Sequence, residues 1–266
     1  SGYHYSDSTI IGFAHTHLNG TGIGDLGDIL FMPTTGTPTT FKGTFDDLSK
    51  GYVSIFSHSN EKVQPGYYSV LLQKYGIKAE LTATSRVGYH RYTFPESVES
   101  NIIIDLGEGI DWDEPTETML KQIDARTIEG YRYSRGWAKN QKIYFTAVFS
   151  KDMNFTKVVE PVFRPRSNDS IDVQKAVLSF ETKKNEAVEV KVAISYVSCK
   201  NAANNLIAEL PNWNFKETLA QAQAKWNTEL SKIRIKTNDE KVRTMFYTSL
   251  FRTMISPSDF CDVNGD

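Results

Sequence analysis

Two histidines close to the amino terminus have the spacing of a ligand-binding pair. His15 and His17 lie in the run Gly-Phe-Ala-His-Thr-His-Leu of residues 12–18. If residues 10–17 are extended, both imidazoles point to the same side, with Cα atoms about 6.5–7 Å apart. Such a pair can chelate a metal or hydrogen-bond the hydroxyl groups of a ligand. A zinc site needs further ligands, so we favour polar ligand contacts or bracing of the loop, with a purely structural pair as the alternative.

The loop that follows these histidines is rich in glycine. Glycines recur between residues 20 and 27, which indicates a backbone that turns sharply or approaches another group closely. The run lacks the Gly-Lys-Ser/Thr signature and the strand-then-helix setting of a phosphate-binding loop. A phosphate-binding role is therefore a weak interpretation of this segment.

A second cluster combines carboxylates with a tryptophan. Asp113 and Glu114 follow Trp112, and Glu117 comes close behind. Glycoside hydrolysis uses two carboxyl groups across the scissile bond, so a glycosidase pair is one interpretation. The run Asp-Glu-Pro-Thr suits a turn or a helix start equally well, and we favour that structural interpretation. Trp137, in a polar and aromatic stretch further on, could stack on a sugar, although a strand entering a loop explains the stretch.

Up to about residue 200 the hydrophobic pattern is that of β-strands. Residues 77–83 and 188–196 alternate apolar and polar side chains with the period of two of a half-buried strand. A third strand, 143–149, has apolar residues on both faces. Further strands are predicted at 10–14, 41–46, 67–73, 86–94, 101–106, 128–134 and 173–182. Strands separated by turn residues, with no helical period between them, predict a mainly β chain folded as an antiparallel β-sandwich.

After residue 205 the pattern becomes helical. Asn214 and Glu217 have the spacing of a capping box, and apolar residues then recur at steps of three and four over 215–233. A second helix is predicted from about 238 to 256. It is apolar on more than one face, so a covering partner is expected in chain that follows Asp266. Residues 256–266 form a loop dense in acids and amides, which composition alone describes as solvated.

Composition and charge narrow the function classes. The net charge is −2 and no basic stripe stands out, which argues against a nucleic-acid surface. The longest apolar runs are far too short to cross a bilayer. The chain starts without methionine, which indicates a processed or truncated product. Cys199 and Cys261 form no CxxC pair, and they can be either one disulfide or two free thiols.

Both ends of the chain resemble glycoside hydrolase family 92. The resemblance rests on Ser-Gly-Tyr-His-Tyr-Ser-Asp-Ser at 1–8, on residues 12–18 and 20–22, and on Asp25-Leu26-Gly27-Asp28. It rests equally on residues 246–251 and on the stretch from Pro257 to Asp262-Val263-Asn264-Gly265. The resemblance implies an amino-terminal β-sandwich, linker helices and an (α/α)6 barrel. We therefore expect a sandwich domain over 1–205, a helical linker over 206–236 and the first helix of the barrel over 237–266.

The resemblance also implies an activity. Members of the family are exo-acting α-mannosidases that remove terminal mannose with inversion, and a calcium ion near O2 and O3 of the sugar helps to distort the ring. A hard cation suits vicinal hydroxyl groups because it prefers oxygen ligands. The family's general acid, general base and calcium ligands lie in the helical domain, so no catalytic or metal-binding residue is assigned to this chain. The expected substrates are α-mannosides or N-glycans, in an extracytoplasmic setting.

The part left to this chain is one wall of a mannose pocket. His15 and His17 are candidates for the pocket rim, Asp262 is the best candidate for a hydrogen bond to a mannose hydroxyl, and Asp25 is a weaker one. The sandwich is expected to pack against its own (α/α)6 domain. The alternatives are a non-catalytic carbohydrate-binding sandwich and a purely structural one.

Overall fold

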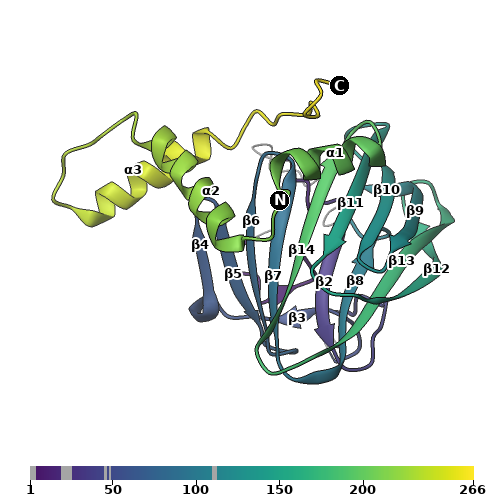
Figure 1. Ribbon diagram of the computed structural model, residues 1–266. Coiled ribbons are helices and arrows are strands. Elements are labelled where there is room, and N and C mark those ends of the chain that lie inside the picture. Colours follow the sequence, from purple (N-terminus) through teal and green to yellow (C-terminus); the bar gives the residue numbers. More distant parts are fainter. Residues whose placement is uncertain (1–3, 19–25, 45–46, 48, 110–112) are drawn as a thin grey trace.

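The computed structural model confirms a mainly β chain built from antiparallel strands (Figure 1). It describes residues 4–18, 26–44, 47, 49–109 and 113–266. The described strands form one eight-stranded, one four-stranded and one two-stranded sheet. Three helices follow the last strand, at the carboxyl-terminal end of the chain.

The eight-stranded sheet has the order β4-β5-β6-β7-β14-β11-β10-β9. Each neighbouring pair in it is antiparallel. Its strands are β4 (Glu61–Gln64), β5 (Tyr67–Leu72), β6 (Ile77–Ala83), β7 (Val87–Phe94), β9 (Glu114–Asp124), β10 (Thr127–Arg135), β11 (Gln141–Phe149) and β14 (Glu186–Ser195).

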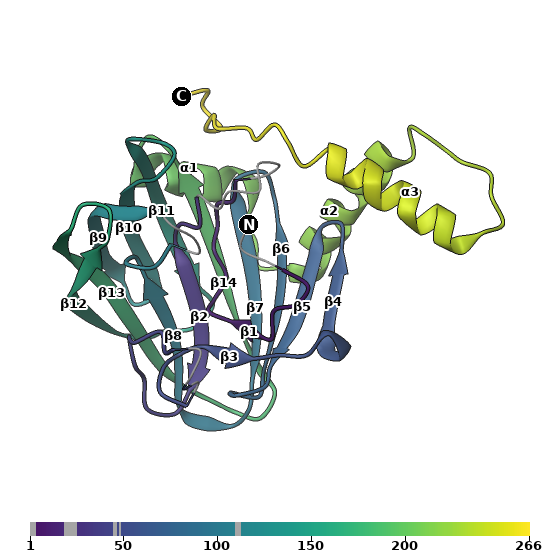
Figure 2. The same ribbon diagram turned by 180° about the vertical axis from the view of Figure 1, so that it is seen from behind.

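The second layer is the four-stranded sheet β12-β13-β8-β2, which faces the larger sheet (Figure 2). Its strands are β2 (Leu30–Thr35), β8 (Ser97–Asp105), β12 (Asn154–Arg164) and β13 (Asp169–Thr182). The short strands β1 (Thr9–Ile10) and β3 (Ser54–Ile55) pair with each other, and a short 3-10 turn, His58–Asn60, precedes β4.

The core lies between the two large sheets. Inward side chains of β2 and β8 meet those of β11, as when the ring of Phe31 packs on Phe145 and Phe149 at centroid distances of 6.3 and 6.4 Å. Strand β7 buries side chains on both of its faces, because Tyr92 and Phe94 belong to this core whereas Val87 and Tyr89 pack under α1. Two sheets that share one apolar interior make the predicted sandwich.

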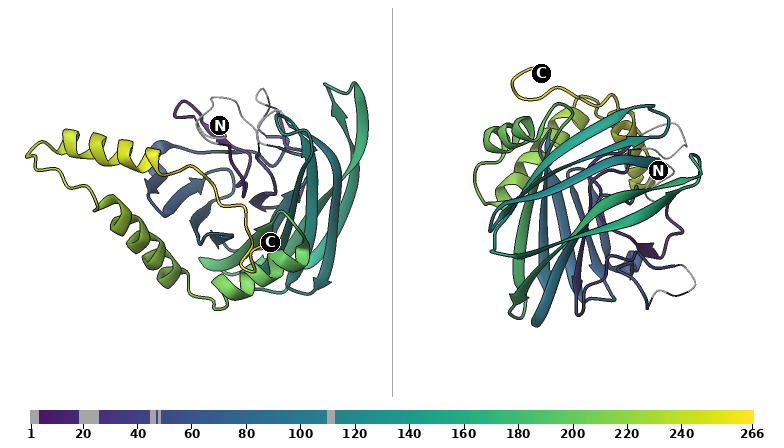
Figure 3. Two further views of the ribbon diagram at one scale, coloured as in Figure 1. Left: turned by 90° about the horizontal axis from the view of Figure 1, so that it is seen from above. Right: turned by 90° about the vertical axis from the view of Figure 1, so that its right-hand side faces the viewer.

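The three helices are α1 (Cys199–Glu209), α2 (Phe215–Leu230) and α3 (Glu240–Thr253). Helix α1 packs on the outer face of the large sheet, while α2 and α3 project to one side and the last residues return across α1 (Figure 3). Asn214 caps α2 by accepting from the Glu217 amide, which confirms the predicted capping box. No helix in the described ranges has both the length and the apolar character needed to span a membrane.

Two local predictions were wrong. Residues 114–124 form strand β9 rather than a turn or helix start. Pro115 is accommodated because β9 is an edge strand and Pro115 lies at a register shift opposite Ser134, where a missing amide donor is tolerated. Of residues 41–46, those that the structure describes form no strand, only a single bridge between Thr44 and Asp47. Helix α1 and strands β2, β3, β4 and β12 were not predicted, because their apolar periods are short or interrupted.

Candidate functional site

A cavity of about 460 Å³ opens where the sandwich meets α2. Its lining comes from β4, β5, β6, β7 and β14, from the turns between them, from the loop of Ala14 and His15, and from α2. The most prominent lining side chains are Tyr67, Tyr68, Arg86, His90 and Trp226. A concave surface of aromatic rings with a few polar groups has the make-up of a small-molecule site.

His15 reaches this cavity from the loop before β2. Its Nδ1 lies 2.7 Å from the Ile29 carbonyl and its Nε2 lies 2.9 Å from Nε2 of His90. Nδ1 of His90 lies 2.6 Å from the Tyr92 hydroxyl. Because a carbonyl only accepts, one consistent assignment has His15 donating to Ile29, His90 donating to His15, and Tyr92 donating to His90. Both imidazoles are then neutral.

Burial explains why the two rings stay neutral. Burial lowers the pKa of His15 to about 4, and the hydrogen bond to Ile29 opposes this shift. Burial and the neighbouring His15 lower the pKa of His90 well below its usual range. Ile29 itself is buried at a φ of 59°, a strained conformation for a β-branched residue. The array therefore braces the loop before β2 against β7.

The structure separates the two histidines that the sequence pairs. His17 is exposed and is not among the residues lining the cavity, whereas His15 is half-buried, lines the cavity, and has protein partners on both ring nitrogens. Of the strand predicted at 10–14, only Ile10 lies in a strand and Phe13 forms a bridge with Phe31. The backbone then bends at His15, so the extended run over 10–17 that would pair the two histidines is absent. Asp25 lies outside the described residues. A sugar contact by any of these three residues stays a prediction.

An ionic cluster holds the neighbouring loops in the sandwich. Arg132 of β10 is fully buried and donates through Nη1 to Asp28 and, at 2.5 Å, to Asp113. Its Nε donates to the Leu106 carbonyl at 3.0 Å. Gln141 also donates to Asp28, at 2.7 Å. The cluster thus joins β10 to the loop before β2 and to the loop between β8 and β9.

The charges in this cluster depend on one another. Burial raises the pKa of Asp28, and the guanidinium of Arg132 opposes that rise. Burial by itself lowers the pKa of Arg132, but Asp28 and Asp113 raise it above the usual range. One oxygen of Asp113, Oδ1, and one nitrogen of Arg132, Nη2, are buried without a hydrogen-bond partner among the described residues. The guanidinium of Arg132 is therefore the main compensating charge for the buried carboxylates of Asp28 and Asp113.

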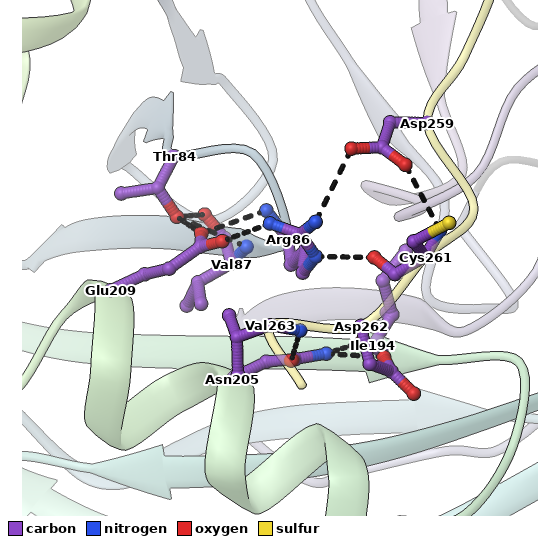
Figure 4. A network of polar contacts seen from close by, with 10 residues as sticks. All are labelled: Thr84, Arg86, Val87, Ile194, Asn205, Glu209, Asp259, Cys261, Asp262 and Val263. Atoms are coloured by element: carbon purple, nitrogen blue, oxygen red, sulfur yellow. Dashed lines mark hydrogen bonds and ion pairs between the residues drawn. The ribbon is translucent and has the colours of Figure 1, made fainter. Parts of the chain in front are cut away.

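Asp262 fastens the last residues of the chain to the sandwich (Figure 4). Its carboxylate is 4% exposed and accepts from Ser195 at 2.7 Å, from Asn201 at 2.8 Å and from Asn205 at 2.6 Å. Asn205 in turn accepts from the Val263 amide at 3.0 Å. Asp262 therefore lies at the junction of β14, α1 and the carboxyl-terminal segment.

Arg86 connects that junction to the cavity. It lies in the turn between β6 and β7, lines the cavity and donates to Glu209 of α1 at 2.7 Å. The same guanidinium donates to the Cys261 carbonyl at 2.5 Å and to Asp259 at 3.2 Å (Figure 4). The hydrogen bond to Glu209 is the largest cause of a raised Arg86 pKa. One side chain thus joins the cavity, α1 and the segment that carries Asp262.

The other carboxylates singled out in the sequence have protein partners. Glu114 accepts from the Arg166 amide at 2.6 Å and from Ser167 at 3.0 Å, and Glu117 accepts from Tyr131 at 2.6 Å. Trp112 lies outside the described residues, and Trp137 is exposed. Cys199 and Cys261 are free thiols. Within the described ranges, no three His, Cys, Asp or Glu side chains gather in a way that could hold a metal ion.

Sequence reasoning did not single out Arg86, Glu209, Asn201 or Asn205. These residues lie in a turn and on a helix without a motif, and their partners are far along the chain, as with the 123 positions between Arg86 and Glu209. His90 belongs to the strand predicted at 86–94, yet the hydrophobic period of that strand does not show that His90 hydrogen-bonds to His15. Only the sequence runs near each end of the chain drew attention to Asp28 and Asp262.

Comparison with known proteins identifies this arrangement. The model of the glycosyl hydrolase family 92 N-terminal domain matches residues 1–195, and that of the family 92 catalytic domain matches residues 201–266. A sandwich followed by the start of a helical catalytic domain defines the chain as part of a glycosyl hydrolase. The chain belongs to glycosyl hydrolase family 92.

Solved structures and a curated relative agree with this assignment. The family 92 α-mannosidase BT3965 from Bacteroides thetaiotaomicron is 40% identical over 100% of this chain, with a TM-score of 0.91. The inverting mannosidase BT2199 of the same organism is 26% identical over 100% of the chain, with a TM-score of 0.81. An uncharacterized secreted glycosidase of Arthroderma benhamiae is 25% identical over 99% of the chain. This chain spans 37%, 35% and 37% of those three proteins.

Proposed function

We propose that the whole protein is an inverting, calcium-dependent exo-α-mannosidase that acts on mannose-containing glycans outside the cytoplasm. The observation that carries the proposal is the 40% identity over the entire chain to a family 92 α-mannosidase, with a TM-score of 0.91. The inverting stereochemistry is supported by the similarity to BT2199, which is an inverting mannosidase. The extracytoplasmic setting is supported by the relative from Arthroderma benhamiae, which is described as a secreted glycosidase.

The proposed calcium ion does not fit the described residues. The described ranges contain no group of three potential ligands that could hold a metal. The buried carboxylates Asp28 and Asp113 already face Arg132, and Asp262 faces three neutral donors. The proposal therefore assigns the ion, and with it the general acid and base, to other parts of the catalytic domain.

For this chain we propose a supporting role at the sugar pocket. Asp262 has three donors on its carboxylate, and a carboxylate offers about four acceptor sites. One acceptor site thus remains for a mannose hydroxyl. Ser195, Asn201 and Asn205 would hold the carboxylate in one orientation, which lowers the entropy cost of the contact. His15 would contribute indirectly: it lines the nearby cavity and holds the loop before β2 in position through its contacts with Ile29 and His90.

The activity can be tested on the full-length protein with an aryl α-mannoside. We expect the first product seen by proton NMR to be β-mannose, because an inverting enzyme attacks the face opposite the leaving group. We expect a chelator to abolish activity and added calcium to restore it. Release of α-mannose first would exclude inversion, and full activity in the chelator would exclude the calcium requirement.

Two variants can separate the proposed sugar contact of Asp262 from its contribution to docking the carboxyl-terminal segment. Asp262→Asn is expected to lower kcat/KM by about 10- to 100-fold, the loss of one hydrogen bond to a charged acceptor. Asn205→Ala removes a docking donor of the carboxyl-terminal segment and keeps the carboxylate. It should lower the melting temperature with a smaller loss of kcat/KM. Equal losses in both variants would show that Asp262 acts only as a structural anchor.

A further inference from the structure

A second cavity, of about 290 Å³, lies at the opposite end of the sandwich from the first. Tyr75 lines the second cavity, just before β6 begins, whereas Arg86 lines the first, just after β6 ends. The seven residues of β6 separate them by roughly 20 Å. The second cavity is bordered by the end of β2, by residues 37–52 that the structure describes, and by the turn between β5 and β6. Its lining is Thr34, Thr35, Thr37, Thr39, Phe41, Ser49, Lys50, Gly51, Tyr52, Lys74, Tyr75 and Ile103.

One lining hydroxyl has no hydrogen-bond partner among the residues that the structure describes. Thr34 is 3% exposed, and its Oγ1 is buried without a hydrogen bond. An unpaired buried hydroxyl is destabilising, and valine would fill the same volume without that penalty. The neighbouring Thr35 reaches the Tyr75 carbonyl only at 3.5 Å. The end of β2 therefore places hydroxyl groups that lack strong partners among the described residues at the wall of the cavity.

An aromatic side chain lies beside these hydroxyls. Phe41 is 53% exposed although it borders the cavity, so much of its ring remains open to solvent. Hydroxyl groups beside an aromatic face are the combination that a pyranose ring needs, because its C–H face is apolar and its edge is polar. The cavity lies at the small end of the range for ligand sites, which suits one sugar residue.

The two lysines in the lining already have anionic or carbonyl partners. Lys74 donates to the Gly51 carbonyl at 2.5 Å, and its ammonium lies 5.4 Å from the centre of the Tyr75 ring. Lys50 lies 3.0 Å from Asp47. Because these charges are partly neutralised, the cavity favours a neutral polyol over an anion.

We propose that this cavity is a second saccharide-binding site, which takes one neutral pyranose residue of a glycan and does not take part in hydrolysis. It would hold a branched or polymeric substrate through a second sugar, at the end of the sandwich away from α1, α2 and the last residues of the chain. The proposal goes beyond the proposed hydrolysis, and only the choice of mannose as the probe rests on that function.

The test uses the full-length protein, D-mannose as the probe and isothermal calorimetry. Thr34→Val and Phe41→Ala are each expected to weaken one of two mannose-binding events roughly tenfold, the effect of losing one hydrogen bond or one stacking contact. Phe163→Ala is the matched control, because Phe163 is similarly exposed at 58% but lies on β12, outside the cavity lining. All three variants should keep the kcat/KM of the parent protein on a small aryl α-mannoside.

The outcomes separate this site from the proposed activity. Unchanged mannose binding in both cavity variants would overturn the proposal. Binding of inorganic phosphate that is lost in the same variants would also overturn it, because the site would then be an anion site. If the protein bound mannose through Phe41 but hydrolysed no mannoside, the proposed function would fail while this proposal stood.

Discussion

Replacing Arg132 by methionine is expected to lower the free energy of unfolding by about 3–5 kcal/mol. The guanidinium is fully buried and faces Asp28 and Asp113, whose side chains are both inaccessible to solvent. Methionine fills part of the volume but leaves two carboxylates without a cation, in a place where burial already raises the pKa of Asp28. Urea denaturation followed by circular dichroism measures the loss.

Arg135→Met provides the matched control for this prediction. Arg135 lies on the same strand and pairs with Glu114 at 3.3 Å, but its side chain is 42% exposed. Exposed ion pairs contribute up to about 1 kcal/mol, so the control should be nearly neutral. Asp28→Asn combined with Asp113→Asn should recover part of the loss caused by Arg132→Met, because the uncompensated charges are then gone. Equal free energies of unfolding for Arg132→Met and Arg135→Met would contradict the role assigned to the buried cluster.

Acidification from pH 6.5 to pH 4 is expected to remove roughly 3 kcal/mol of stability through His15 alone. Burial lowers the pKa of His15 from 6.5 to about 4 in the folded protein. As the pH falls, the unfolded chain therefore takes up the proton first. The stabilisation is complete above pH 6.5 and is lost as the pH falls toward 4. His90, whose pKa is also lowered, adds to the loss in the same direction.

The double variant His15→Gln, His90→Gln isolates this effect. Between pH 6.5 and 5.5 few carboxylates titrate, so the slope of stability against pH in this window reports mainly on histidines. We expect a steep slope in the parent protein and a flatter one in the double variant, measured by urea denaturation at each pH. His4→Gln, which changes an exposed histidine outside the array, serves as control. A parent slope no steeper than that of the double variant would rule out the neutral array.

Much of the fold could be predicted because its signals are local. The period of two over 77–83 matches β6 to the residue, and the cap formed by Asn214 and Glu217 lies three positions apart in the chain. The strand at 114–124 was missed because Pro115 reads as a turn in sequence. Only its position at the edge of the sheet, beside a register shift, makes it compatible with a strand.

The candidate site likewise combines residues that sequence motifs pointed out with contacts that no local pattern predicts. The runs at the two ends of the chain were enough to identify the family, and they contain Asp28 and Asp262. What those acids contact could not be predicted, since Arg132 lies 104 positions from Asp28 and Ser195 lies 67 positions from Asp262. Long-range partners depend on which strands become neighbours, and one strand's pattern does not carry that information.

The sandwich class, the helix cap and the family could therefore be predicted from the chain alone, because side-chain period, capping and motif all act within a few residues. The folded chain was needed to show that both ring nitrogens of His15 have protein partners while His17 is exposed, that Asp262 anchors the last segment, and that Thr34 lies at the wall of a second cavity. This division follows from burial. Whether a polar group is desolvated, and which distant group then becomes its partner, is set only when two sheets close over a common core.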